Sequence, residues 1–164
     1  MLQLQKEYVQ AGTNILYAPT FTANRVKLAE YHLEKNMSSM IHDLVAISKE
    51  AATDTPGHPV YVAGDITMTG EQLRPMGKME LEDLIAIYKE QILCLVDAGA
   101  DLLVVETMMS LAETRAALIA AKEVCDLPVI ATLTFEADGR TLFGTDAKTA
   151  AVVLESPVSY THLT

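Results

Sequence analysis

The residues of this chain best suited to chemistry are polar side chains that follow short apolar runs. Glu106 comes directly after the apolar residues 102–105, and Asp65 ends the segment 60–65. Comparable positions after these and two further apolar runs carry hydroxyl, amide or carboxyl groups: Thr20, Thr22, Asn24, Thr67, Thr69, Thr107, Thr132, Thr134 and Glu136. If the runs are parallel strands, their carboxyl ends meet at one edge, which is where α/β folds bind ligands. The pattern therefore predicts a small-molecule site.

The two carboxylates each allow two interpretations. Glu106 follows four apolar residues and must be satisfied in a largely dry environment. A substrate ammonium group would satisfy it, and so would a neighbouring Arg, Lys or backbone donor. Gly64-Asp65 could likewise be a turn in which the aspartate only caps the backbone. The residue pattern alone leaves these alternatives open.

Other common catalytic arrangements are missing from the sequence. Cys94 and Cys125 are the two cysteines, and their spacing matches neither a disulfide framework nor a zinc site. The glycines form no GxGxxG or P-loop motif, the serines are not placed as in a hydrolase triad, and none of the four histidines follows an apolar run. The sequence therefore predicts no metal site, no nucleotide site and no catalytic nucleophile.

Apolar periodicity predicts the elements that must position the polar residues. Helices are expected over about 2–10, 23–33, 38–52, 80–97, 110–124 and 147–155, and strands over about 14–18, 60–65, 102–105 and 129–134. The strands are continuously apolar, as in a parallel sheet covered by helices. A helix that ends in Ala-Gly before a strand occurs twice, at Gly12 and Gly99, which indicates repeated βα units. The fold class is therefore α/β.

Two architectures fit this order of elements. A (β/α)8 TIM barrel takes about 250 residues, so four βα units would be half of one. An open doubly wound sheet, in contrast, could be complete at 164 residues. The chain starts within a helical pattern and ends on an irregular segment, which favours a partial barrel.

Charge and composition exclude several classes of protein. The chain has 12 Lys and Arg against 22 Asp and Glu, a formal charge of −10, so it offers no basic patch to nucleic acid or to an anionic membrane surface. Half of its residues are hydrophobic, which is enough for a folded core. Asp97 and Asp101 interrupt the most apolar stretch, and the N-terminus lacks a signal-peptide pattern. We therefore expect no membrane segment and a cytoplasmic location.

Three strand-end segments together resemble one known family. The segments AGTNILYAPTF at 11–21, GDITMTG at 64–70 and AGADLLVVET at 98–107 are similar to motifs of the homocysteine S-methyltransferases, and residues 138–140 and 144–145 extend the similarity. The similarity runs from about residue 1 to residue 156, and the whole resembles the homocysteine-binding module of the cobalamin-dependent members. It implies a (β/α)8 barrel, of which this chain would hold about four βα units.

The resemblance also implies a reaction and a substrate. The family binds homocysteine to a zinc ion held by three cysteines, and the zinc-bound thiolate attacks a methyl group. Glu106 occupies the position of the family glutamate that holds the homocysteine amino group, and we expect Thr20, Asp65 and Thr134 to bind substrate with it. The implied donor is methyltetrahydrofolate, acting through cobalamin in other modules of the parent protein, ahead of betaine or S-methylmethionine.

Parts of the family pattern are missing. The first strand and both cysteine-bearing zinc segments are absent, Cys94 and Cys125 cannot replace them, and Pro19 stands where the family has Asn. The tail 157–164 does not continue the pattern, which indicates a frameshift, a sequencing junction or a divergent terminus. We therefore expect an inactive fragment with a partial barrel domain at 1–156. The alternative is a complete, non-enzymatic small-molecule-binding domain with an open α/β sheet.

Overall fold

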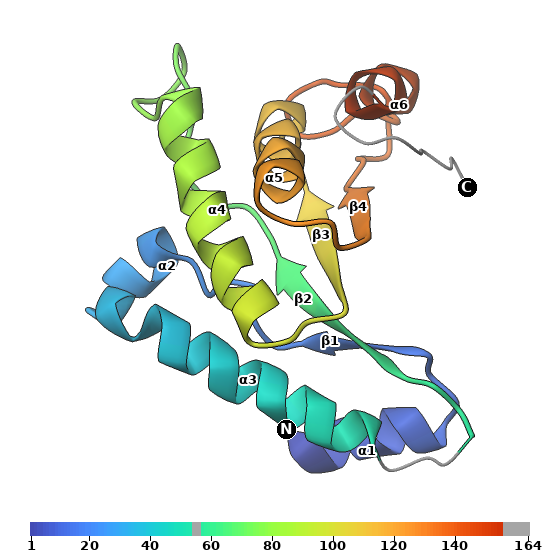
Figure 1. Ribbon diagram of the computed structural model, residues 1–164. Helices are drawn as coiled ribbons and strands as arrows, with labels where there is room; N and C mark the ends of the chain where they lie inside the picture. The colour runs from blue at the N-terminus through green and yellow to red at the C-terminus, as the bar shows by residue number, and fades with distance from the viewer. Residues whose placement is uncertain (54–56, 156–164) are drawn as a thin grey trace.

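The computed structural model describes residues 1–53 and 57–155, in which helices and strands alternate along the chain (Figure 1). The tail predicted at 157–164 lies outside the described residues. The strands are β1 (Ile15–Ala18), β2 (Tyr61–Ile66), β3 (Leu102–Met108) and β4 (Val129–Leu133). The helices are α1 (Leu2–Gln10), α2 (Arg25–Ala29), α3 (Met37–Ala52), α4 (Leu81–Asp97), α5 (Leu111–Val124) and α6 (Ala147–Glu155), with a 3-10 turn, η1 (Glu34–Asn36), before α3.

Two elements differ from the boundaries that the sequence predicts. The helix expected over 23–33 is restricted to α2, because the Asn24 side chain caps its start by accepting the Lys27 N–H at 3.0 Å, and the backbone turns at His32, where φ is +58°. Strand β3 continues to Met108, past the expected end at residue 105. Glu106 therefore lies within the strand rather than after it.

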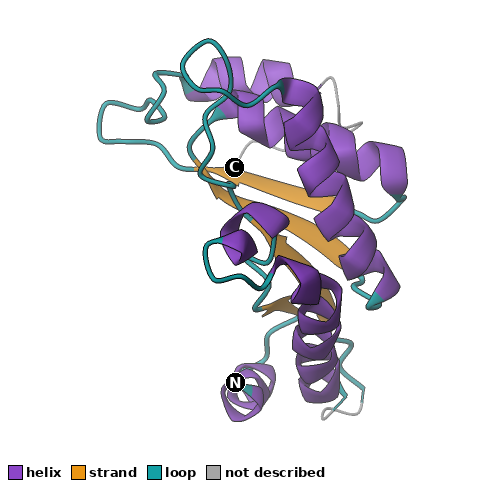
Figure 2. Ribbon diagram, turned by 90° about the vertical axis from the view of Figure 1, so that its left-hand side faces the viewer, coloured by secondary structure: helices purple, strands orange, loops and turns teal. Residues whose placement is uncertain are grey.

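The order of the strands decides between the two architectures. All pairings are parallel, and the strands lie in the order β1-β2-β3-β4, without the reversal that a doubly wound sheet requires. Because parallel crossovers are right-handed, an unreversed order places every connecting helix on the same face. Figure 2 shows the long helices along one side of the sheet. The fold is therefore a partial (β/α)8 barrel, as the resemblance implies, and not an open doubly wound sheet.

The two faces of the sheet have different neighbours. Val62, Ile66 and Leu103 pack with residues of α3, α4 and α5 in the main core. The alternate positions, Ala63 and Val104 among them, form a separate small cluster that contains no helical residue. Side chains of a strand point alternately to opposite faces, so Asp65 and Glu106 share the second face, which is the inside of the barrel.

The repeated Ala-Gly sequence corresponds to a repeated turn. Gly12 and Gly99 both have left-handed φ angles, +97° and +87°. The Gly12 N–H donates to the Val9 carbonyl, and the Gly99 N–H donates to the Val96 carbonyl, each at 3.0 Å. In each case the backbone N–H of the following residue donates to the carbonyl five residues before it. These two hydrogen bonds complete the same helix-ending motif at both places. The sequence echo thus reflects two equivalent helix-to-strand connections.

Candidate functional site

Asp65 and Glu106 meet on the inner face of the sheet. Strands β2 and β3 pair with Asp65 opposite Val104, so Glu106 lies two residues further along the neighbouring strand on the same face. Such diagonal neighbours are within reach of a long side chain. The sequence places both carboxylates at the carboxyl ends of strands, which agrees with this register, and the charge of Glu106 contributes to the raised pKa of Asp65.

Asp65 is a buried carboxylate with an incomplete set of hydrogen bonds. The residue is only 6% exposed, and its Oδ1 atom has no hydrogen-bond partner in the described protein. Burial, and secondarily the negative charge of Glu106, raise the pKa of Asp65 to about 7, although a hydrogen bond from the Ile66 backbone opposes the shift. Burial also raises the pKa of the nearby Tyr17, with smaller contributions from Glu106 and Asp65. The raised pKa leaves Asp65 partly protonated at neutral pH, and its Oδ1 atom remains available to a donor.

Thr20 supports Asp65 through the backbone. Its hydroxyl donates to the Asp65 carbonyl at 2.9 Å and accepts the Asp65 N–H at 3.0 Å, and the residue is fully buried. This pair of bonds joins the end of β1 to β2 and fixes the position from which the carboxylate projects. Thr20 was predicted from the sequence to bind substrate, and its hydroxyl is occupied by these contacts.

Thr134 contacts β3 through its backbone. It follows β4, its side chain is exposed, and its backbone N–H donates to the Met108 carbonyl at 2.8 Å. This bond extends the β3–β4 pairing through Thr134, and among the described residues no hydrogen bond joins the Thr134 hydroxyl to Asp65 or Glu106. Its binding role stays a prediction.

A third carboxylate, Glu113, has a role that the sequence analysis did not identify. Its pattern with Ser110 indicates a helix cap, and the Ser110 hydroxyl does accept the Glu113 N–H at 3.3 Å. The carboxylate itself turns to another part of the fold, where Oε1 accepts the N–H of Thr69 at 2.7 Å, the hydroxyl of Thr69 at 2.8 Å and the hydroxyl of Tyr88 at 2.9 Å. Glu113 thus ties the loop after β2 to the start of α5. The apolar run around Tyr88 gave no signal of a polar partner.

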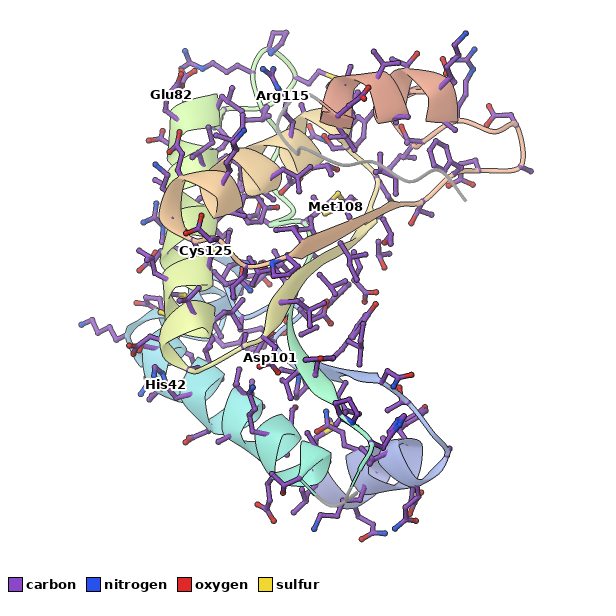
Figure 3. All side chains as sticks on the ribbon, turned by 45° about the vertical axis from the view of Figure 1, so that its right-hand side comes forward. His42, Glu82, Asp101, Met108, Arg115 and Cys125 are labelled. Carbon is purple, nitrogen blue, oxygen red and sulfur yellow. The ribbon has the colours of Figure 1, made fainter. Side chains whose placement is uncertain are left out.

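The cysteines lie far from the candidate site. Cys94 is in the last turn of α4 and Cys125 directly follows α5, so both are at the amino ends of the strands that come next. Figure 3 labels Cys125 on the outer, helical layer, and labels Asp101 and Met108 at the two ends of β3. In residues 1–53 and 57–155, no group of three or more His, Cys, Asp or Glu side chains could hold a metal ion.

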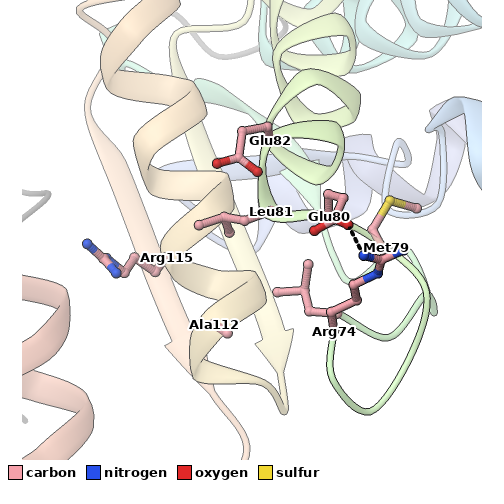
Figure 4. A pocket seen from close by; sticks show the side chains of 8 residues that line it. Arg74, Met79, Glu80, Leu81, Glu82, Ala112 and Arg115 are labelled. Atoms are coloured by element: carbon pink, nitrogen blue, oxygen red, sulfur yellow. Dashed lines mark ion pairs between the residues drawn. The ribbon is translucent and has the colours of Figure 1, made fainter.

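A surface cavity of about 260 Å³ lies between the starts of α4 and α5 (Figure 4). Its lining includes Arg74 and Arg115, but Arg74 is already paired with Glu80, with 2.7 Å between Nη1 and Oε1. Neither Asp65 nor Glu106 lines it. The cavity is therefore separate from the carboxylate pair.

None of the helices in the described part of the chain combines the length and apolar character needed to cross a bilayer.

Comparisons with known sequences identify one family. A model of the homocysteine S-methyltransferases matches residues 1–162. The methionine synthases of Mycobacterium leprae (strain TN) and Mycobacterium tuberculosis (strain ATCC 25618 / H37Rv) are each 26% identical over 159 residues, which is 93% of this chain and 13% of those proteins. The chain thus spans about an eighth of the length of these curated relatives.

Solved structures of the homocysteine methyltransferase MmuM from Escherichia coli have the same fold. The oxidized form superposes with a TM-score of 0.80 at 20% identity, covering 93% of this chain and 56% of that protein. The metallated form superposes with a TM-score of 0.81 at 19% identity, covering 96% and 59%. The strand order agrees with the fold of these structures, and the family model covers nearly all of the sequence: this chain belongs to the homocysteine S-methyltransferase family.

Proposed function

We propose that this chain is the amino-acid-binding part of a homocysteine S-methyltransferase, in which Asp65 and Glu106 receive the ammonium group of homocysteine. The observation that carries the proposal is the unpartnered Oδ1 of the buried Asp65, on the same face as Glu106. Two carboxylates without a cation are costly at such a site. A primary ammonium group offers one positive charge and three donors, which suits this pair of acceptors.

The thiol chemistry requires groups that the described residues do not supply. In this family, zinc would convert the homocysteine thiol to a nucleophilic thiolate at neutral pH. The described side chains do not fit a zinc site, and both cysteines lie at the other end of the strands. The contribution proposed for this chain is therefore to bind and orient the amino acid, while thiolate formation belongs to the full-length enzyme. The chain alone is expected to be inactive.

The methyl donor and location are proposed from the relatives. Similarity to methionine synthases supports methyltetrahydrofolate acting through cobalamin, with both bound by other modules of a longer protein. The coverage of 13% of those relatives is consistent with such a parent. A cytoplasmic location is proposed with it. Activity is therefore to be measured on the full-length methyltransferase that carries this segment.

The proposal predicts that binding depends on the amino group of the ligand. We define the amino-group ratio as the Kd of 4-sulfanylbutanoate, which is homocysteine without its amino group, divided by the Kd of homocysteine. Because the lost contact is a charge-assisted hydrogen bond, the ratio should be about ten or more. Calorimetric titration without methyl donor measures both constants. A ratio near one would contradict the proposed function.

The raised pKa of Asp65 predicts that the amino-group ratio depends on pH. Below about pH 7, Asp65 is protonated in the free protein, and the ammonium group must displace that proton. The ratio should therefore rise about three- to tenfold between pH 6 and pH 8. Both free thiols are mostly protonated over this range, so the proton lost when a thiolate forms affects the two constants to nearly the same extent. Asp65→Asn should remove the dependence, whereas the exposed Asp126→Asn should retain it; a slope unchanged in Asp65→Asn would refute the assignment.

A further inference from the structure

The peptide bond between Glu106 and Thr107 departs from the regular sheet. The β3–β4 pairing shifts register between Val105 and Met108. Thr107 has a φ of +56°, a left-handed conformation that is unusual for any residue but glycine and more so for a β-branched one. Irregular strand positions of this kind redirect a side chain and often occur beside functional sites. Glu106 is the residue whose direction is set here.

Both polar atoms of this peptide bond are held by threonine side chains. The Thr67 hydroxyl, just after β2, donates to the Glu106 carbonyl at 2.9 Å. The Thr132 hydroxyl, on β4, accepts the Thr107 N–H at 3.1 Å. In a regular ladder, backbone groups of the neighbouring strands would make these bonds. Here two threonine side chains, one on each side of β3, bind this single peptide group instead.

We propose that Thr67 and Thr132 are positioning residues that aim the Glu106 carboxylate toward Asp65 by fixing the peptide bond that follows it. This inference rests on the proposed function, because the direction of the Glu106 side chain affects ligand binding only if Glu106 binds the substrate ammonium group. A peptide held at its carbonyl and at its N–H cannot rotate freely. The direction of the adjacent Glu106 Cα–Cβ bond is therefore fixed before the ligand arrives, and less ordering remains to oppose binding.

The two threonines differ in ways that are useful for an experiment. Thr67 is 6% exposed and uses its hydroxyl as a donor, so valine would leave the Glu106 carbonyl without this partner. Thr132 is exposed and uses its hydroxyl as an acceptor. Thr132→Val should therefore fold normally, and it can decide the test even if Thr67→Val does not fold. Serine at either position would retain the hydroxyl.

The test is the amino-group ratio in the full-length enzyme. Loss of one of these hydrogen bonds should reduce the ratio about three- to tenfold in Thr67→Val and Thr132→Val, while the Kd of 4-sulfanylbutanoate changes less than about twofold. Thr67→Ser and Thr132→Ser should restore the ratio. Thr53→Val is the matched control, because its hydroxyl also donates to a backbone carbonyl, that of Glu50 at 2.8 Å, but at the end of α3.

A Glu106→Gln variant separates failure of this inference from failure of the proposed function. If the ratio is unchanged in Glu106→Gln, the proposed function fails and the positioning role with it. If the ratio falls in Glu106→Gln but stays at the wild-type value in Thr132→Val, the ammonium site stands and the positioning role is refuted. A valine variant that weakens both ligands equally also refutes it, because such a loss is general destabilisation of the site.

Discussion

Glu106→Gln should raise the KM for homocysteine about 10- to 100-fold and change kcat by less than a few fold. Glutamine has the same size as glutamate but no charge, so the substitution removes one charge-assisted hydrogen bond to the ammonium group, worth about 1.5–3 kcal/mol. The amino group takes no part in methyl transfer, so the loss affects ground state and transition state alike, which appears in KM. Steady-state kinetics of the full-length enzyme measures both constants.

The remaining carboxylate of Asp65 limits how far the KM for homocysteine rises. Removal of the Glu106 charge also removes one of the causes that raise the pKa of Asp65, so the remaining carboxylate is more fully ionised at neutral pH and compensates in part. The matched control is Glu82→Gln, in the first turn of α4 and away from the inner face. An unchanged KM in Glu106→Gln, or an equal rise in Glu82→Gln, would remove the assigned role.

Their positions at the ends of strands explain why sequence alone could identify Asp65 and Glu106 as candidate site residues. Continuous apolar runs identify buried parallel strands, and the carboxyl ends of such strands share one edge whatever the wider architecture. The pattern of apolar runs does not choose between barrel and open sheet, because the same run of βα units serves both. The family resemblance implies the barrel, and the unreversed strand order, a property of long-range pairing, confirms it.

The roles of three threonines required the backbone geometry. Thr20 bonds both backbone groups of Asp65, and Thr67 and Thr132 bond one rotated peptide. In the sequence all three are only polar residues near strand ends, and the register shift that gives two of them their partners has no local sequence signal. Glu113 also required the structure. A capping pattern predicts its backbone contact with Ser110, but it does not predict which distant groups its carboxylate binds.

Glu113→Ala should lower the free energy of unfolding of the purified chain by about 3–5 kcal/mol, because it removes the acceptor of three buried hydrogen bonds at once. Glu113 is 4% exposed and Tyr88 is fully buried, so water cannot easily replace the lost carboxylate. Burial, with the nearby Glu113 carboxylate as the second cause, raises the pKa of Tyr88, which keeps its hydroxyl protonated as a donor. Chemical denaturation measures the change.

Two further substitutions test whether the network, rather than the loss of a side chain from α5, causes this destabilisation. Glu113→Gln keeps one acceptor oxygen and should cost less, about 1–2 kcal/mol. Glu123→Ala removes a glutamate from the same helix that is half exposed and paired with Lys89, and should cost at most about 1 kcal/mol. The loop that Glu113 holds at Thr69 also carries Thr67, so the network supports the residue that positions Glu106. If Glu113→Ala and Glu123→Ala cost the same, the buried network does not anchor this loop, and Thr67 must be positioned by the strand ends alone.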